Sequence, residues 1–220
     1  MREIKSFVKR SSRITKAQKK ALQNYWYEYG INTDTNNLDF RKIFNNNHPV
    51  VLDIGFGNGE SIIKMAKSNL NFNYIGIEVY EAGIGKLINN AKKNLLTNIK
   101  IIKNDAVEVL KNNISDFSLS AVNIFFPDPW HKKRHHKRRL INEEFLKLLT
   151  RKLMPNAYLH IATDWQEYAD EIIFLLSKDK NFKNIPDKEF AIKNLRPQTK
   201  FELRGIRLGH SVWDIIFSKC

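Results

Sequence analysis

The stretch VVLDIGFGNG, residues 50–59, decides the fold. Residues 50–54 are apolar except for Asp53, and three alternate glycines follow them. Glycine permits the tight turn and the close backbone approach that a strand-to-helix loop needs around a ligand. Residues 60–68 then continue with a helical pattern. We therefore expect a strand, a glycine loop and a helix in succession.

The same alternation of strand and helix continues along the chain. Strands are expected over residues 50–54, 73–79, 99–103, 121–126 and 158–162. Helices are expected over residues 60–68, 83–94, 107–111, 141–153 and 166–177. Two β-like runs, 200–203 and 212–217, are expected to form an antiparallel hairpin on the sheet edge. The predicted fold is α/β, with a mostly parallel seven-stranded sheet and helices on both faces.

Length and composition indicate one globular domain with a short extension. The chain has 220 residues, of which 42% are hydrophobic and 27% charged. Residues 1–47 are interpreted as a basic N-terminal extension with a helix over 15–29 capped by Thr15, and residues 48–220 as the α/β domain.

No apolar run approaches the roughly 18 residues that a membrane span needs, and the first residues do not read as a secretory signal. We expect a cytoplasmic protein with no membrane contact and no obligatory protein partner. The single cysteine, Cys220, cannot form an internal disulfide, and no Cys/His cluster predicts a metal site.

The net charge of +14 points to a polyanionic partner. Residues 1–30 carry a net +6 and residues 128–139 a net +5, so 42 residues hold 11 of the 14 charges. A coding bias toward lysine would spread the charge more evenly. We interpret the two stretches as a nucleic-acid footprint. Lys9, Arg10, Arg13 and Lys16 are expected to contact the nucleic-acid backbone, unless the N-terminal segment is only an incidentally basic tail.

Acids follow the first three predicted strands of the domain. Asp53 precedes the glycines, Glu78 lies 25 residues further on, and Asp105 follows the third strand. Glu78 can accept hydrogen bonds from ribose hydroxyls, and Asp105 can meet an adenine amine or a neighbouring backbone amide. Turn residues and solvated acids are the plain alternative.

The spacing of these residues separates two classes of cofactor. Dinucleotide enzymes seat a pyrophosphate on Gly-x-Gly-x-x-Gly. This chain has Gly-x-Gly-x-Gly, and an acid at Asp53 would repel a pyrophosphate but attract the cationic groups of S-adenosyl-L-methionine. We predict S-adenosyl-L-methionine as the cofactor, bound by Asp53, Gly55, Gly57, Gly59, Glu78 and Asp105.

A second motif, FFPDPWHKKRHHKRR, occupies residues 125–139. Prolines stiffen the loop, so that it can hold Asp128 and Trp130 beside a transferable methyl group. A solvated or nuclear-targeting patch is the alternative reading of the basic residues that follow. No acids are spaced to complete a metal site with the histidines.

This motif resembles the signature of the tRNA (guanine-N7)-methyltransferases. LDIGFG at 52–57 is similar to their cofactor loop, although many members carry Glu at position 53. Further matches are GIEV at 76–79, DA at 105–106, ATDW at 162–165, TKFE at 199–202 and RLGH at 207–210. The resemblance runs from about Ser6 to the C-terminus. It implies a Rossmann-like class I methyltransferase fold, and tRNA guanine-46 as the substrate.

The resemblance also implies roles for individual residues. It adds Asp128 to the cofactor pocket, and it assigns to substrate binding Lys132, Asp164, Thr199, Lys200, Phe201 and Glu202. We expect phosphate contacts from Arg134, Arg138 and Arg139 as well. Asp164 has an alternative role as a helix cap, and Trp130 can stack on the base or pack in the core.

Guanine N7 carries a lone pair and no proton, so its methylation needs no general base. Asp128 is therefore predicted to be catalytic through positioning and electrostatics, by accepting from the N1–H and N2–H₂ edge of guanine. The alternatives are a class I methyltransferase acting on an exocyclic base amine of RNA or DNA, and a non-catalytic RNA-binding module. An NAD-linked oxidoreductase fits less well because it leaves Asp53 and the basic run without a role.

Overall fold

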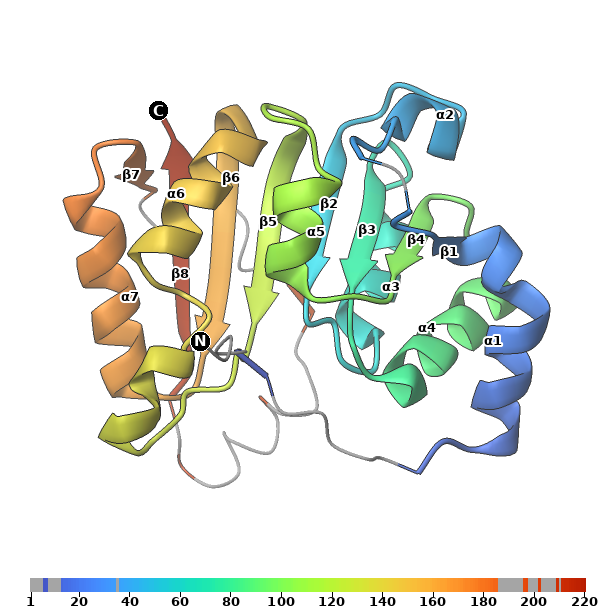
Figure 1. Cartoon of the computed structure of the whole chain (residues 1–220), viewed down its shortest axis with the longest axis horizontal. Coiled ribbons are helices and arrows are strands. Elements are labelled where there is room, and N and C mark those ends of the chain that lie inside the picture. Colours follow the sequence, from blue (N-terminus) through green and yellow to red (C-terminus); the bar gives the residue numbers. More distant parts are fainter. Residues whose placement is uncertain are drawn as a thin grey trace.

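The computed structural model describes residues 6–7, 13–34, 36–185, 196–197, 202, 209 and 211–220. These residues form one mixed β-sheet that is covered by helices (Figure 1). The strands are β1 Gly30–Ile31, β2 Val50–Ile54, β3 Asn73–Ile77, β4 Ile99–Ile102, β5 Leu119–Phe125, β6 Leu153–Thr163, β7 Phe182–Asn184 and β8 Trp213–Lys219. The helices are α1 Lys16–Tyr29, α2 Phe40–Phe44, α3 Glu60–Ser68, α4 Glu81–Lys93, α5 Ala106–Asn112, α6 Glu143–Lys152, α7 Gln166–Lys178 and the 3-10 helix η1 Lys133–Arg138.

The strands form one sheet in the order β1-β4-β3-β2-β5-β6-β8-β7. Every pairing among β1 to β6 is parallel, whereas β8 runs antiparallel to both β6 and β7. The predicted mostly parallel sheet is confirmed, with eight strands in place of seven. The chain winds outward from β2 through β3 to β4 and then crosses to β5 on the other side of β2. The carboxyl ends of β2 and β5 therefore border a topological switch point.

Alternate residues of the strands feed two hydrophobic layers. Leu52 and Ile54 pack with side chains of α5, α6 and α7, such as Leu149 and Ile172. Val51, between them, packs with side chains of α1, α3 and α4. Figure 1 shows α5 and α6 lying across the near face of the sheet. Because both faces are covered, all five residues of β2 are buried.

Residues 13–34 and 36–47 pack against this same sheet. Thr15 caps α1 as predicted, with its Oγ1 accepting from Gln18 N at 3.3 Å and its N donating to Gln18 Oε1 at 2.8 Å. Helix α1 lies directly on α4, since a Cβ added at Gly85 would lie 2.6 Å from Gln18 O. Strand β1 extends the sheet beside β4, and Tyr29 is buried in the core. This segment is thus part of the packed domain.

The antiparallel edge pair has a partner that was not predicted. Strand β8 matches the predicted run 212–217, but it pairs with β7 at 182–184 as well as with β6. Of the predicted partner run 200–203, the structure describes only Glu202. Across the described ranges, no helix combines the length and the apolar character needed to cross a membrane.

Candidate active site

A cavity of about 550 Å³ opens at the carboxyl ends of β2, β3 and β5. This is the switch point at which open α/β sheets bind ligands. Its wall combines the glycine loop after β2, the end of β3 and the loop after β5. Ser6, Phe7 and Leu140 also line it, and nothing in the sequence pattern indicated that these residues reach the site.

The glycine loop forms a shallow cradle on the wall of the cavity. Gly55, Gly57 and Gly59 have φ values of 71°, 56° and 74°, which disfavour side chains. An added Cβ at Gly55 or Gly57 would meet nothing within 4 Å, and both residues line the cavity. Gly59 has a packing role, since its Cβ would lie 2.7 Å from Leu87 of α4. The loop therefore leaves open the space that side chains would fill.

Glu78 is fixed where β3 ends. Its side chain is buried, and Oε2 accepts from Gly57 N at 2.9 Å. Oε1 accepts from Val79 N at 2.7 Å and from Tyr80 N at 3.2 Å. Burial raises the pKa of Glu78 and the charge of Asp128 raises it further, while the three N–H donors oppose this rise. The carboxylate is thus locked in one orientation at the cavity wall.

Asp53 is the most constrained acid of the site. It is 1% exposed, and its Oδ2 has no hydrogen-bond partner among the residues that the structure describes. Burial, with a contribution from the charge of Glu78, raises the pKa of Asp53 to about 7. A buried carboxylate beside a second one favours a cation or an N–H donor and disfavours a phosphate. The cavity therefore suits the cationic groups of S-adenosyl-L-methionine and does not suit a pyrophosphate.

Asp105 meets the second of its two expected partners, a backbone amide. It caps α5 by accepting from Val107 N at 2.8 Å through Oδ1. Its neighbours Asn104 and Ala106 line the cavity. Sequence reasoning also missed Ser61 in the first turn of α3. Ser61 lines the cavity, and its buried Oγ has no hydrogen-bond partner within the described part of the chain.

The loop after β5 presents Asp128 at the cavity in a strained backbone. Phe126 and Trp130 have φ values of 54° and 51°. Bulky residues rarely adopt such values, at a cost of roughly 1–3 kcal/mol each, unless the surroundings enforce them. Phe126 N donates to Ala162 O at 2.7 Å, and Trp130 Nε1 donates to Ser6 O at 3.2 Å. Asp128 itself is exposed and lines the cavity.

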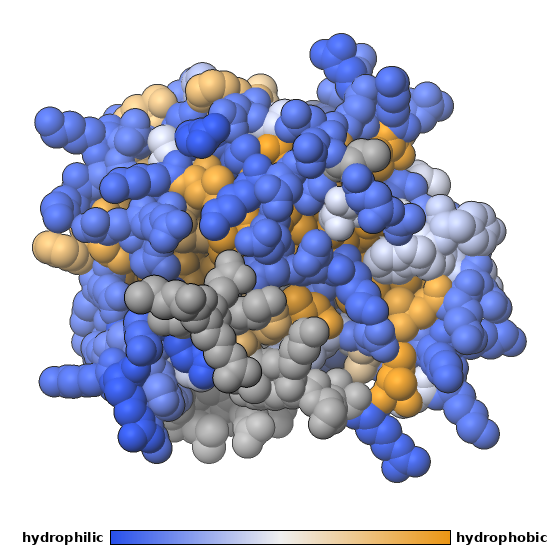
Figure 2. Space-filling view, viewed as in Figure 1, coloured by the Kyte–Doolittle hydropathy of each residue, from blue (hydrophilic) through white to orange (hydrophobic). Residues whose placement is uncertain are grey.

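The basic run is divided between the surface and the interior. Lys132 and Arg134 are exposed and available to a large ligand. Arg138 is half-buried, with its guanidinium 4.1 Å from the centre of the Trp130 ring. The indole thus packs within the protein against this cation. Hydrophilic side chains cover most of the described surface on the face seen in Figure 2.

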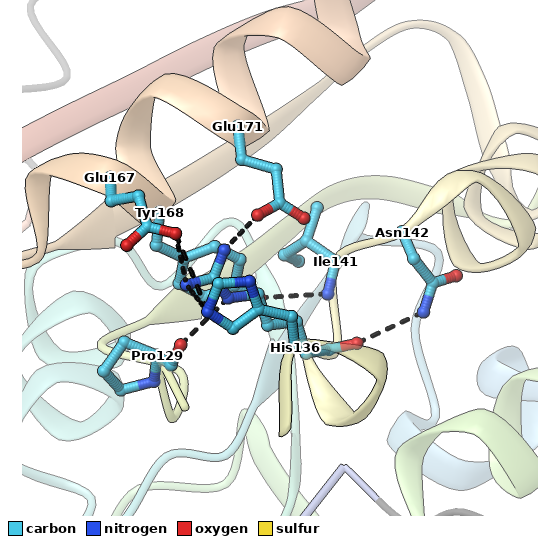
Figure 3. A network of polar contacts seen from close by, with 8 residues as sticks. Pro129, His136, Ile141, Asn142, Glu167, Tyr168 and Glu171 are labelled. Carbon is cyan, nitrogen blue, oxygen red and sulfur yellow. Dashed lines mark hydrogen bonds and ion pairs between the residues drawn. The ribbon is translucent and has the colours of Figure 1, made fainter. Parts of the chain in front are cut away.

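Arg139 does not contact phosphate as predicted, because its side chain is 1% exposed. Its Nε donates to Pro129 O at 2.9 Å, and its terminal nitrogens pair with Glu171 and, at 3.3 Å, with Glu167. Figure 3 shows the two glutamates on α7 pointing toward Pro129 and His136. The guanidinium is thus enclosed by protein partners and is not presented at the surface.

Asp164 lines the cavity at the end of β6. The helix-capping alternative is not supported, because Trp165 is the N-cap residue of α7 and no side chain caps it. Asp164 therefore remains a candidate for substrate binding.

The predicted substrate residue Glu202 is 6% exposed and faces the interior. Its carboxylate accepts two hydrogen bonds from Arg196, at 2.6 and 2.8 Å. Arg196 also donates to Asp214 at 2.8 and 2.9 Å, and His160 contacts the same carboxylate at 2.7 Å. These partners hold Glu202 in a buried network, and its contact with the substrate stays a prediction. Thr199, Lys200 and Phe201, the other members of this motif, lie outside the described residues.

Comparison with known proteins gives consistent results. Residues 47–215 match the family model described as "Putative methyltransferase". The chain is 46% identical to the tRNA (guanine-N(7)-)-methyltransferase of Francisella philomiragia, over all of this chain and 96% of that protein. It is 48% identical to the tRNA (guanine-N(7)-)-methyltransferase of Nitrosococcus oceani, over 99% of this chain and 92% of that protein.

Solved structures share the fold at low sequence identity. The 16S rRNA methyltransferase KamB has a TM-score of 0.57 and 16% identity, covering all of this chain and 99% of its own. The aminoglycoside resistance methyltransferase NpmB1 has a TM-score of 0.55 and 18% identity, covering 82% of this chain and 92% of its own. These likenesses confirm the Rossmann-like methyltransferase fold.

Proposed function

Because this chain belongs to the tRNA (guanine-N(7)-)-methyltransferase family, we propose that it transfers a methyl group from S-adenosyl-L-methionine to N7 of guanine-46 in the variable loop of tRNA. The observation that carries the proposal is the buried pair Asp53 and Glu78 in a cavity whose mouth is bordered by Asp128. The basic run follows Asp128 directly in the chain, so one site combines a cation-binding wall with a surface suited to RNA.

Different residues of the cavity wall bind different parts of the cofactor. S-adenosyl-L-methionine, when bound, supplies an electrophilic methyl group on a positively charged sulfur. Asp53 attracts a cationic group of this ligand, since its Oδ2 is unpaired among the described residues. Glu78 accepts hydrogen bonds from ribose hydroxyls. Gly55 and Gly57 let the ligand approach the backbone closely.

The loop side of the cavity handles the base. Asp128 accepts from N1–H and N2–H₂ of guanine, which adenine lacks, and its negative charge balances the positive charge that develops on the purine. Asp164 borders the same cavity and contributes a second acceptor. Lys132, Arg134 and Arg138 contact the phosphates of the RNA. The N-terminal basic segment makes a second contact with the RNA backbone. The proposed reaction requires neither proton abstraction nor a protein partner, and we propose that it takes place in the cytoplasm.

The position of the methyl group is tested with two transcripts of one tRNA, one carrying guanine and the other adenine at position 46. Both are incubated with labelled S-adenosyl-L-methionine, and the nucleosides are then identified. We expect 7-methylguanosine from the first transcript only. Equal incorporation into both would exclude position 46. A product methylated on an exocyclic amine would support the alternative reaction. If the folded wild-type protein gives no methylated product, the alternative of a non-catalytic RNA-binding module is favoured.

A further inference from the structure

The loop that carries Asp128 has a strained backbone that its own residues do not enforce. Phe126 and Trp130, on either side of it, both have left-handed φ values. The prolines at 127 and 129 restrict their own φ and that of their neighbours, but they do not enforce a left-handed conformation. Strain of this kind persists only where the surroundings over-determine it. The contacts that hold this loop are therefore the place to look for residues that set the position of Asp128.

One of these contacts links the loop through Arg139 to helix α7. Arg139 Nε donates to Pro129 O at 2.9 Å, next to Asp128 in the chain. One terminal nitrogen pairs with Glu171, and the other contacts Glu167 at 3.3 Å and His136 Nε2 at 3.1 Å. A guanidinium has five N–H donors in a rigid plane, so these contacts fix the loop relative to helix α7 in one geometry.

The segment beyond Arg139 is tied to the same helix. The guanidinium lies 4.8 Å from the centre of the Tyr168 ring, and the hydroxyl of this tyrosine accepts from Ile141 N at 3.1 Å. Arg139 O accepts from Asn142 Nδ2 at 3.2 Å, and Asn142 in turn caps α6 (Figure 3). The anchor of the loop thus consists of two helices and one buried cation.

Adjacent arginines therefore have opposite orientations. Arg138 is half-buried with its guanidinium over the ring of Trp130, whereas Arg139 points inward and is 1% exposed. Taking a guanidinium out of water is unfavourable unless its partners compensate for it. Glu167 and Glu171 are partly exposed, so water can solvate both carboxylates where this cation is absent. Its burial is explained if the cation is needed to hold the loop.

We propose that Arg139 is a positioning residue for the methyl transfer, holding the Pro129 carbonyl so that Asp128 faces the base. This inference rests on the proposed function, because it assigns Asp128 to the reacting guanine. A displacement of about 1 Å from productive geometry lowers turnover on the order of 100-fold. Loss of Arg139 therefore affects kcat, whereas loss of an exposed cation in the same run affects the KM for tRNA.

The test compares Arg139→Met, Arg139→Lys and the matched control Lys137→Met, which loses the same charge from an exposed position. We expect kcat to fall about 10- to 100-fold in Arg139→Met, with the KM for tRNA changed less than about threefold. Arg139→Lys should recover part of kcat, since an ammonium keeps a glutamate partner but cannot also reach the Pro129 carbonyl. Lys137→Met should keep kcat and raise KM.

A second readout reports on the loop without any turnover. Uniform 5-fluorotryptophan labelling gives one 19F resonance for each of the four tryptophans, and Trp130→Phe assigns the resonance of Trp130. In Arg139→Met this resonance should shift or broaden, while that of Trp26 on α1 stays unchanged. If Arg139→Met does not fold, Glu171→Gln loosens the same anchor and should give the same two effects in weaker form.

Wild-type kcat or an unchanged Trp130 resonance in the folded variant would overturn the positioning role. The two failures are distinguishable. Absence of 7-methylguanosine from the wild-type protein would refute the proposed function, and an unaltered kcat in Arg139→Met of an active enzyme would refute only this inference.

Discussion

Replacing Asp53 by Asn should make the ligand-free protein more stable and the cofactor site weaker. The carboxyl group is 1% exposed, and its pKa is raised from 3.8 to about 7 by burial and by Glu78. A carboxyl group with a raised folded-state pKa stabilises the fold below its unfolded pKa, and this stability is lost as the pH rises through the folded value. Here the loss falls between about pH 4 and pH 7.

The size of the effect follows from the same two pKa values. They correspond to roughly 4 kcal/mol of free energy of unfolding at pH 8. Asparagine is nearly isosteric with the protonated acid, but its amide also needs partners, so part of this gain is lost. At roughly 2–4 °C per kcal/mol for a chain of this size, we expect the melting temperature to rise by about 5–10 °C at pH 8. Near pH 4.5 the variant and the wild type should differ little.

Cofactor binding should change in the opposite direction. Removing the charge removes a charge-assisted hydrogen bond, worth roughly 1.5–3 kcal/mol, so affinity should fall about 10- to 100-fold. In the wild type, affinity should increase as the pH rises through about 7 and Asp53 ionises, and in the variant this dependence should disappear. Thermal unfolding across pH 4.5–8.5 and calorimetry with S-adenosylhomocysteine measure both effects. A variant no more stable than the wild type at pH 8, or one that binds equally well, would refute the reasoning.

Three further changes test the remaining parts of the site. Glu78→Ala should weaken S-adenosylhomocysteine binding about tenfold or more through lost ribose hydrogen bonds, and unchanged calorimetric affinity in the folded protein would remove Glu78 from the site. Asp128→Asn should nearly abolish methylation in a single-turnover assay while cofactor affinity changes less, because an amide cannot balance the charge on the purine; near-normal turnover would show that this charge is unimportant. Arg138→Ala should raise the KM for tRNA and reduce the log–log salt dependence of tRNA binding by about 0.7–0.9 per lost phosphate contact, whereas an identical salt slope would place Arg138 outside the RNA interface.

The sequence predicted the structure best where a local pattern of residues determines the backbone conformation. The buried run at 50–54 and the glycines after it located β2 and the cofactor loop, because apolar periodicity and positive φ values are local properties. Helix α3 was predicted over its observed range of residues 60–68 for the same reason. The short β1 and β7 were missed, since two or three residues show no periodicity and their pairing depends on distant strands.

The site was harder to predict where identical residues have different surroundings. The sequence does not distinguish Arg138 from Arg139. Only the packing of α7 buries Arg139, where it donates a hydrogen bond to Pro129 O. The sequence likewise did not indicate that Glu202 pairs with Arg196. Tertiary contacts determine whether a charged side chain is buried, and the local sequence does not predict these contacts.

The position of β8 has a consequence for how the protein is made. This strand lies between β6 and β7, although it follows both in the chain. During synthesis β7 must wait for a strand whose last residue comes 35 positions after its own, from 184 to 219. At about 5–20 residues per second, the ribosome needs roughly 2–7 s to deliver that strand. The outer edge of β6 waits longer, since β6 ends at residue 163, and until β8 pairs with it the unpaired backbone exposes the nascent chain to aggregation more than the folded protein.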